Sequence, residues 1–343
     1  MVIEFLVLAA GLLVLVKGAD MMVSSASVMA KAFNIPGFIV GIFVVALGTS
    51  FPEAVIGIYS GFEKANLLAV GDVVGSSIVN ITLVIGVTVM IAPILIDYQA
   101  IKREILLSIL IQVILLLMVA SGLWLSRLEA GVLLGGMVGF VGFIVSKTRQ
   151  ISRDEFPDSP AELEIFELLE DEAVIVNQTD QKQPIRMDDY PGKTLKKHGP
   201  RFIAGLIAMV LGAKFAVDNA VAIASSLGLA KELIGLTIIA FGTSLPEFVA
   251  GIIAVIKKED DIAVGNIIGS NIMNILLVLG LSGMINPITF ADLSIFGDLA
   301  AMIFASILLL VPVWRSNRIS KYWGFVYVSF YVLYIAYKLG AVF

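Results

Sequence analysis

Long apolar windows recur along this chain of 343 residues, and they constrain its fold more than any other feature. A helix needs roughly 20 residues to cross a hydrocarbon layer of about 30 Å, and windows of that length return along the whole chain between short polar breaks. Hydrophobic residues make up 59% of the chain and charged residues 15%, against about 45–50% and about 25% in soluble domains. The sequence therefore predicts an all-α integral membrane protein that spans the lipid bilayer of the cell membrane several times.

Ten transmembrane helices are predicted from these windows, with limits that are soft by several residues. The first window has no basic region before it and no small-residue cleavage site, so we expect it to be retained as a helix. The predicted spans are residues 2–28, 35–60, 67–93, 104–124, 128–147, 201–227, 233–256, 262–287, 297–314 and 321–340.

Basic residues concentrate in alternate loops between these spans. Because Lys and Arg accumulate on the cytoplasmic side of a membrane, the richer set predicts which loops face the cytoplasm. With ten spans, both termini are then extracellular and the acidic loop of residues 148–200 is cytoplasmic. The richer set consists of Lys31, Lys102, Arg103, Lys147, Arg149, Lys196, Lys197, Arg201, Lys257, Lys258, Arg315, Arg318 and Lys321.

The two halves of the chain repeat each other. The segment that begins "GIFVVALGTSFPEAVIGIYSG" at Gly41 matches, without a gap, the segment that begins "GLTIIAFGTSLPEFVAGIIAV" at Gly235, and the match extends over two spans. Five spans are an odd number, so the second half would enter the membrane from the opposite side. We therefore expect two inverted five-helix repeats, residues 1–147 and 201–343, joined by the loop 148–200, with a site between them near the midplane.

A proline and a glutamate stand inside an apolar run in each half, in "GTSFPE" from Gly48 and "GTSLPE" from Gly242. Proline provides no N–H for the carbonyl four residues earlier, so Pro52 and Pro246 would each break a helix and free backbone oxygens. A carboxylate inside a membrane is costly and by default indicates function. The alternative is a simple kink, with the Ser and Thr hydroxyls bonded to their own backbone.

Helical spacing gathers further oxygen atoms near these glutamates. Side chains three or four residues apart share one helical face, and both halves also repeat two small-residue pairs, Gly71 with Gly75 and Gly265 with Gly269, which favour close helix packing. Carboxylate, hydroxyl and amide oxygens without nitrogen or sulfur ligands suit Ca²⁺ and Na⁺. Two glutamates balance one Ca²⁺, two Na⁺ or two protons, which is the alternation that an exchanger needs. The side chains are Thr49, Ser50, Glu53, Ser76, Asn80, Thr243, Ser244, Glu247, Ser270 and Asn274.

Other chemistry is excluded or unsupported by the sequence. The chain has no cysteine, which removes disulfides and thiolate ligands; its one histidine, His198, lies in a polar loop. No basic stripe interleaved with aromatic residues predicts a nucleic-acid partner, and nothing in the sequence predicts a cofactor or an enzyme. Asp72 is either at the edge of the ion site or a cap of the third span. Lys17 and Asp20, and Lys214 and Asp218, either pair with each other or extend to water.

These motifs resemble those of the cation/calcium antiporter superfamily, and in particular its sodium/calcium exchanger branch of prokaryotic type. The resemblance is carried by "GTSFPE" and "GTSLPE" together with "GDVVGSSIVN" and "GNIIGSNIMN". It implies that the side chains named above, apart from Asn274, hold the transported Ca²⁺ and Na⁺, and that Ala46 and Ala240 add backbone carbonyls. Some relatives have an aspartate at the position of Asn274. The resemblance also implies that the first and sixth spans slide across the remaining helices to give alternating access.

Three other functions are alternatives to sodium/calcium exchange. A Ca²⁺/H⁺ antiporter would use the same two glutamates with H⁺ as the coupling ion. A passive channel needs a continuous pore, often formed by a ring of subunits, whereas one chain here provides both halves of a closed site. An intramembrane hydrolase would need paired acids beside a substrate-sized cleft, which the sequence does not predict. The sequence does not determine the oligomeric state.

Overall fold

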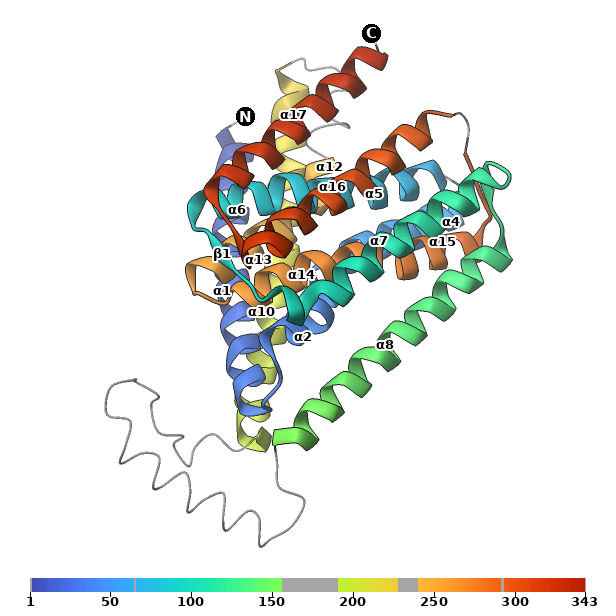
Figure 1. The fold of residues 1–343 in the computed structure, drawn as a ribbon. Coiled ribbons are helices and arrows are strands. Elements are labelled where there is room, and N and C mark those ends of the chain that lie inside the picture. The colour runs from blue at the N-terminus through green and yellow to red at the C-terminus, as the bar shows by residue number, and fades with distance from the viewer. Residues whose placement is uncertain (1, 65, 156–190, 228–239, 291–292, 343) are drawn as a thin grey trace, which may run out of the picture.

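The computed structural model describes residues 2–64, 66–155, 191–227, 240–290 and 293–342. Over these residues the chain is almost entirely helical, and its strands are only two residues long (Figure 1). Seven described helices are long and apolar enough to cross a membrane, and up to eight if a bent pair is counted as one span. A predicted span, 233–256, lies partly outside the described residues, so the count of ten remains a prediction.

The first half of the chain begins with one unbroken helix and continues with two interrupted ones. Three short π-helical segments in the described chain, labelled η, lie between α-helical segments of the same rod. The elements are α1 (Val2–Ala32), α2 (Gly37–Ile39), η1 (Val40–Val45), α3 (Ala46–Thr49), α4 (Phe51–Phe62), α5 (Asn66–Val79), η2 (Asn80–Val84), α6 (Ile85–Ile91), β1 (Ile94–Leu95), α7 (Tyr98–Ala120), β2 (Trp124–Leu125) and α8 (Arg127–Glu155).

The described elements of the second half follow the same order. Its elements are α10 (Pro191–Ser226), α12 (Ala240–Thr243), α13 (Leu245–Ile256), α14 (Asp260–Met273), η4 (Asn274–Leu279), α15 (Gly280–Ile285), β3 (Ile288–Thr289), α16 (Ser294–Ser316), β4 (Arg318–Ile319) and α17 (Lys321–Val342).

Helix α7 begins at Tyr98, six residues before the predicted start of the fourth span at residue 104. It begins there because Asp97 caps it, with the Asp97 side chain accepting a hydrogen bond of 3.0 Å from the Gln99 N–H. An aspartate in this position satisfies a backbone donor that would otherwise have no partner in the first helical turn. The polar residues of that turn hid the helix from a search for apolar windows.

Two helical rods form the centre of the molecule. The span Leu68–Ile91, made of α5, η2 and α6, has 72% of its most apolar window buried, and the span Asp260–Ile285, made of α14, η4 and α15, has 94% buried. The five other candidate spans bury between 22% and 39% of theirs and surround this centre. The central rods carry the second repeated segments of the sequence, "GDVVGSSIVN" and "GNIIGSNIMN", so these segments lie in the interior of the bundle.

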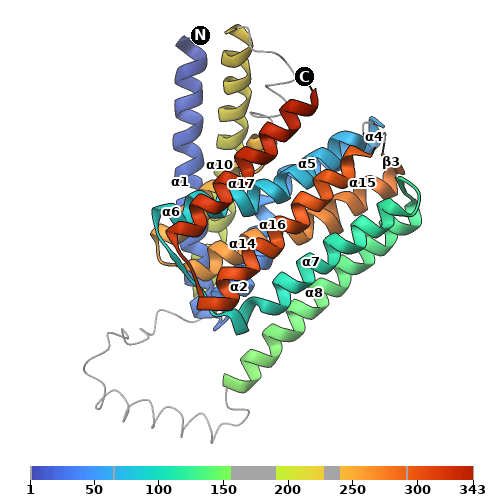
Figure 2. The same ribbon diagram turned by 45° about the horizontal axis from the view of Figure 1, so that its top comes forward.

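Helices α1 and α10 lie side by side along one flank of the bundle, as Figures 1 and 2 both show. Glycines make their contact close. A Cβ atom added at Gly18 would lie 2.5 Å from the Met209 nitrogen, and one added at Gly212 would lie 2.4 Å from the Leu15 nitrogen. Small residues allow the backbones of membrane helices to touch in this way. The close packing couples α1 and α10 into one unit.

The short strands tie the two halves together at opposite corners. Ile94 and Leu95 of β1 pair antiparallel with Ile319 and Arg318 of β4. Trp124 and Leu125 of β2 pair with Thr289 and Ile288 of β3. The two ladders pair equivalent positions of the repeat, because Ile94 and Leu95 are 194 positions before Ile288 and Thr289, and Trp124 and Leu125 are 194 positions before Arg318 and Ile319. The same offset separates Gln112 from its hydrogen-bond partner Ser306. The contacts therefore repeat with the period of the sequence.

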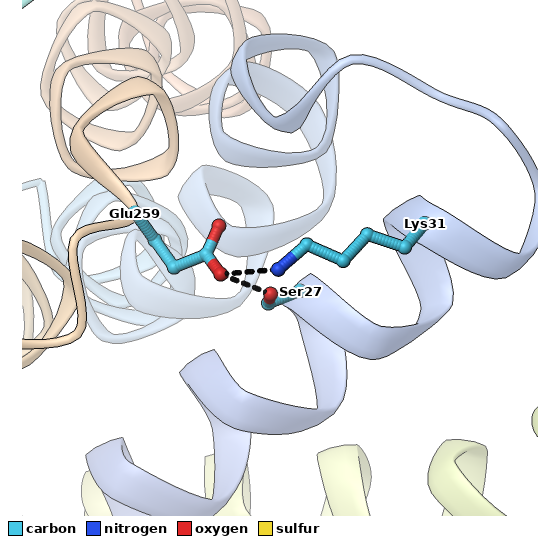
Figure 3. Close-up of polar contacts among 3 residues, drawn as sticks. All are labelled: Ser27, Lys31 and Glu259. Atoms are coloured by element: carbon cyan, nitrogen blue, oxygen red, sulfur yellow. Dashed lines mark hydrogen bonds and ion pairs between the residues drawn. The ribbon is translucent and has the colours of Figure 1, made fainter. Parts of the chain in front are cut away.

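Several basic loops meet at one end of the bundle, here called the basic end. The Lys31 Nζ lies 2.8 Å from the Glu259 Oε1, and the same oxygen accepts a 2.5 Å hydrogen bond from Ser27 (Figure 3). Lys257 pairs with Asp20 at 2.8 Å. These contacts fasten the C-terminal part of α1, from Asp20 to Lys31, to the turn between α13 and α14. Of the alternatives for the charged residues in the long helices, Lys214 pairs with Asp218 at 3.7 Å, whereas Asp20 has a partner outside its own helix.

The predicted close packing of the glycine pairs is observed in one half. A Cβ atom added at Gly265 would lie 2.6 Å from the Phe38 oxygen, and one at Gly269 would lie 2.1 Å from the Ile42 oxygen, so α14 touches the backbone of α2 and η1. A Cβ atom added at Gly71 or at Gly75 would have no other described residue within 4 Å beyond the backbone of its own helix. The corresponding segment of the second half, residues 232–239, lies outside the described residues, and the prediction for this pair stays open.

Candidate ion-binding site

Both copies of the motif interrupt a helix, as the two prolines predict. Helix α3 ends at Thr49 and α4 begins at Phe51, with a bend of 47° between the two helical arms. Ser50, at the break, has φ −82° and ψ 9°, and Ser244 has φ −82° and ψ 4°. In each copy the proline stands at the start of the second helix, where its missing N–H costs nothing. Each break therefore places a serine hydroxyl and a glutamate on the first turn of a new helix.

The two glutamates are enclosed completely. Glu53 and Glu247 each have 0% of their surface exposed. The Glu247 Oε1 accepts hydrogen bonds from Ser50 at 3.2 Å and from Ser270 at 3.3 Å. Ser50 belongs to the first half of the chain and Ser270 to the second, so this carboxylate is held by both halves at once.

Threonine hydroxyls join the broken helices to the central rods. The Thr49 Oγ1 donates to the Asn266 Oδ1 at 3.0 Å and lies 3.4 Å from the Ser270 Oγ. In the other half the Thr243 Oγ1 lies 3.3 Å from the Ser76 Oγ. The two contacts are equivalent in the repeat: Thr243 is 194 positions after Thr49, and Ser76 is 194 positions before Ser270. The motif of each half thus reaches the central rod of the opposite half.

Asn80 and Asn274 mark the points where the central rods change from α-helical to π-helical winding. Segment η2 begins at Asn80 and η4 begins at Asn274. Both asparagines are fully buried. A π-helical turn inserts one extra residue into a helix, and such turns are frequent at functional sites. The sequence showed the asparagines but not the change in winding.

A contact between the central rods was missed by the sequence analysis. The Asn80 Nδ2 donates to the Asn271 Oδ1 at 3.2 Å, and the Asn271 Nδ2 donates to the Ser77 backbone oxygen at 3.3 Å. Asn271 is 1% exposed. Asn271 occupies the position equivalent to Ser77. Two polar residues at equivalent positions of two apolar spans were the sequence signal that could have identified this contact. Asn271 keeps the Asn80 amide group oriented with its oxygen free.

Ala46 already uses its carbonyl within the chain. That oxygen accepts the Ser50 N–H at 2.9 Å and the Thr49 hydroxyl at 3.3 Å. Ala240 is the first described residue after the gap at 228–239 and begins α12. The Ala46 carbonyl is thus hydrogen-bonded within the chain. That Ala46 and Ala240 coordinate an ion with their backbone oxygens remains a proposal.

Asp72 does not cap the third span. Helix α5 begins at Asn66, and its first turn contains no acidic residue. Asp72 instead lies within hydrogen-bonding reach of Thr243, as its counterpart Asn266 lies beside Thr49. Of the two alternatives, the structure therefore supports a place at the edge of the glutamate cluster.

Several buried oxygen atoms of the residues in and beside the two breaks have no hydrogen-bond partner among the described residues. Burying a polar group without a hydrogen bond costs free energy, and a cluster of such atoms indicates an additional partner such as an ion. The atoms include both Glu53 carboxylate oxygens, the Glu247 Oε2, the Ser244 Oγ, the Asn80 Oδ1 and the Asn274 Oδ1.

This oxygen set fits a hard cation. Ca²⁺ takes six to eight oxygen ligands from carboxylates, amides, hydroxyls and carbonyls. In the described part of the chain, no three His, Asp or Glu side chains are grouped in a way that would hold a metal. Two carboxylates surrounded by neutral oxygens provide enough negative charge to balance one divalent ion. A permanent metal site built only of carboxylates would carry more negative charge. Such a composition is suited to an ion that enters and leaves.

Comparison with known proteins gives a consistent result. The family model described as sodium/calcium exchanger protein matches residues 3–146 and 200–340. The inner membrane protein YrbG of Escherichia coli is 34% identical over 92% of this chain and 90% of its own length. The sodium/calcium exchanger MaX1 of Methanosarcina acetivorans is 32% identical over 97% of both chains.

A solved structure extends the likeness to three dimensions. The sodium/calcium exchanger from Methanococcus jannaschii superimposes with a TM-score of 0.78 at 26% sequence identity, over 98% of this chain and 99% of that chain. Two of these three proteins are named as sodium/calcium exchangers and the third as an inner membrane protein, so the likeness covers the fold and the membrane character of the chain.

Proposed function

Because the chain belongs to the sodium/calcium exchanger protein family, we propose that it is a secondary active antiporter that exchanges Ca²⁺ for Na⁺ across the cell membrane. The observation that carries the proposal is the pair of fully buried glutamates, Glu53 and Glu247, placed at two helix breaks among oxygen atoms that have no partner in the described part of the chain. The transported ions are substrates of this transporter, which is not an enzyme and uses no cofactor.

The proposed ion site combines residues from both halves of the chain. Glu53 and Glu247 balance the charge of the ions, and the hydroxyl and amide oxygens complete the coordination. The contacts of Ser50 and Ser270 with Glu247 support this grouping. The proposed ligands are Ala46, Thr49, Ser50, Glu53, Ser76, Asn80, Ala240, Thr243, Ser244, Glu247, Ser270 and Asn274.

The proposed architecture is ten transmembrane helices in two inverted repeats, residues 1–147 and 201–343, with residues 148–200 between them. The two strand ladders support it, because each maps onto the other under the offset of the sequence repeat. Gln112 supports it as well: its Nε2 donates to the Ser306 Oγ at 2.8 Å, and the two residues are equivalent positions of the halves. Equivalent residues that touch each other lie on a twofold axis.

Alternating access requires one part of the protein to move past another while the site stays between them. We assign the movement to α1 and α10, because the Gly18 and Gly212 contacts make them one unit. Helix α10 of this pair also covers both motif glycines. A Cβ atom added at Gly48 would lie 2.9 Å from Leu206 of α10, and one at Gly242 would lie 2.6 Å from Val217 of the same helix. Sliding of the pair would open the site to one side and close it to the other.

The proposed orientation has both termini outside the cell and loop 148–200 in the cytoplasm. The grouping of Lys31, Lys257 and Arg318 with β1 at the basic end supports it, since these residues belong to the richer set of basic loops. Lys and Arg near the ends of membrane helices favour the cytoplasmic side.

The first test is uptake of radioactive calcium by proteoliposomes that contain the purified full chain. Vesicles loaded with Na⁺ are compared with vesicles that carry only a proton gradient. We expect uptake that requires internal Na⁺. Uptake driven by the proton gradient alone would replace Na⁺ by H⁺ as the coupling ion, and flux without any counter-ion would indicate a channel.

Variants of the glutamates test the site itself. Glu53→Gln and Glu247→Gln remove one charge each with little change of volume, and each is expected to abolish calcium uptake. Glu63→Gln, at the exposed end of α4, is the matched control and should transport as the original protein does. Full transport by Glu53→Gln would refute the assignment of that carboxylate.

Ion binding can also be measured without transport. A ligand that binds the folded state alone raises its stability, by about 2.7 kcal/mol at one hundred times its dissociation constant. We therefore expect Ca²⁺ and Na⁺ each to raise the melting temperature of the detergent-purified protein. The Glu53→Gln, Glu247→Gln double variant should show neither shift, while K⁺ at the same concentration serves as the ionic-strength control.

A further inference from the structure

A groove on the outer face of the bundle lies apart from the ion site. It has a volume of about 530 Å³, runs between α7 and α8, and is bounded along α7 from Arg103 to Ile114 and along α8 from Val132 to Phe143. Its floor is Leu276, a residue of η4. Arg103 is the charged residue of a lining that is otherwise apolar.

Glycines of α8 create the hollow. Gly136 and Gly139 line the groove. A Cβ atom added at Gly136 would lie 3.2 Å from Leu276, whereas one added at Gly139 would have no described residue within 4 Å. Glycines on membrane helices ordinarily allow a second helix to approach. Here no described helix fills the space over Gly139, so the small residues leave room for something that is not part of the described chain.

The length of the groove matches half a membrane. Arg103 and Ile114 are eleven positions apart on one helix, and a rise of 1.5 Å per residue gives about 16 Å. A hydrocarbon layer is about 30 Å thick, so the groove extends over about one leaflet. It begins at Arg103, near the start of the span Ile101–Ala120, and ends at Ile114, about two thirds of the way along that span. A single lipid chain requires this length and this starting depth.

The mouth of the groove carries an uncompensated positive charge. Glu104 and Lys147 neutralise each other at 2.6 Å across α7 and α8. Lys102 donates to Gln99 and lies 5.8 Å from the centre of the Tyr98 ring. Among the described residues no carboxylate pairs with Arg103, which is exposed. A planar guanidinium is well suited to bind a phosphate with two hydrogen bonds.

We propose that this groove binds one anionic phospholipid, with an acyl chain between α7 and α8 and the phosphate on Arg103. The apolar lining accepts the chain, the depth fits one leaflet, and the positive charge at the mouth selects a negative headgroup. Basic pockets between transmembrane helices bind lipid headgroups by the same chemistry. The inference does not depend on which ions the protein exchanges.

A lipid chain in the groove would contact the interior of the bundle at Leu276. This side chain forms the floor of the groove and belongs to η4, the segment that begins with Asn274. Leu276 is 4% exposed, so its position is set by close packing, and core packing responds to a change of even one methylene. A lipid chain above Leu276 would hold η4 against the other central rod.

The experiment measures lipid bound to the purified full chain in detergent. Phosphatidylglycerol and phosphatidylcholine with identical acyl chains are offered in equal amounts, and the retained lipid is counted by native mass spectrometry. Gly139→Leu fills the groove. Gly142→Leu, which is on the same helix outside the groove lining and also has no described residue within 4 Å of its added Cβ, is the matched control. Arg103→Gln removes the charge and keeps the groove.

We expect the original protein and Gly142→Leu to retain phosphatidylglycerol in preference by about fivefold, which is the effect of one basic residue near an anionic lipid. Arg103→Gln should retain both lipids equally, and Gly139→Leu should retain less of both. Equal retention of the two lipids by the original protein would overturn the proposal, as would equal behaviour of Gly139→Leu and Gly142→Leu.

Two further measurements distinguish lipid binding from misfolding and from the binding of a free anion. Melting temperatures within a few degrees of the original protein show that the variants are folded, and Arg103→Gln, which adds no bulk, keeps the test decisive if a leucine variant is unstable. Inorganic phosphate at millimolar concentration should not displace phosphatidylglycerol, because the acyl chain provides most of the contact. Complete displacement would show an anion site without a chain site and would overturn the proposal.

Discussion

The Ser50 hydroxyl donates a 3.2 Å hydrogen bond to the Glu247 carboxylate, although the two residues are 197 positions apart. Ser50 stands at the break between α3 and α4, and Glu247 is on the first turn of α13. A bond between the breaks of the two halves brings both motifs into one cluster. In the proposed exchanger this contact is where an ion would touch both halves at once, so it provides the first prediction.

Replacing Ser50 by alanine should weaken calcium binding without abolishing transport. The change removes one oxygen and one hydrogen bond to a charged group, which is worth about 1.5 kcal/mol, so the half-saturating Ca²⁺ concentration should rise about tenfold. Ser60→Ala is the matched control, because Ser60 is also buried and donates to the Gly57 oxygen of its own helix. Calcium uptake measured over a range of concentrations checks both. Equal affinities would remove Ser50 from the site.

Removing Lys147 should destabilise the protein strongly. Glu104 is fully buried and pairs with Lys147 at 2.6 Å, so Lys147→Met leaves a buried charge without compensation, a cost of about 3–5 kcal/mol. The double variant Glu104→Gln, Lys147→Met should recover most of that loss because neither charge remains. Thermal unfolding in detergent measures the effect. Lys214→Ala is the control: its partner Asp218 is exposed, and such a pair contributes about 0–1 kcal/mol.

Adding a methyl group at Gly18 should push α1 away from α10. The new Cβ atom would lie 2.5 Å from the Met209 nitrogen, and overpacking of this kind costs about 1–3 kcal/mol. If the two helices move as one unit, the exchange rate should fall together with the stability. Gly135→Ala, with no described residue within 4 Å of its added Cβ, should be neutral or stabilising by up to about 1 kcal/mol. An unchanged melting temperature for Gly18→Ala would contradict the close contact.

Neutralising Glu259 should release the end of α1 from the turn before α14. The Glu259 Oε1 holds both Ser27 and Lys31, and α1 must leave this contact if it slides. We expect Glu259→Gln to raise the exchange rate a few fold at low ionic strength, with the difference fading in high salt, which screens exposed charges. The effect is limited because the Lys31 side chain is 72% exposed. Lys31→Gln should act in the same direction, and a slower rate in both variants would refute the release.

Much of the fold followed from local chemistry. The apolar windows correctly indicated a multi-pass membrane protein, and Pro52 and Pro246 correctly located two helix breaks, because a missing N–H disrupts a helix whatever surrounds it. The start of α7 at Tyr98 was missed because it depends on one capping side chain, Asp97. The π-helical turns at Asn80 and Asn274 were also missed. They change the winding by one residue without a sequence signal of their own.

The sequence by itself determined which residues would be costly to bury: two glutamates with their neighbouring hydroxyls and amides, each repeated 194 positions later. The free-energy cost of placing a polar or charged side chain inside a membrane is a property of that side chain, so it can be judged from the sequence alone. Tertiary structure alone decided which of them meet. It brought Ser50 to Glu247, gave Asp20 the partner Lys257 from the turn after α13, and placed no other described residue over Gly139. These outcomes depend on how helices that are far apart in the sequence pack against each other. The local spacing of residues along the chain carries no information about the distance in space between such helices.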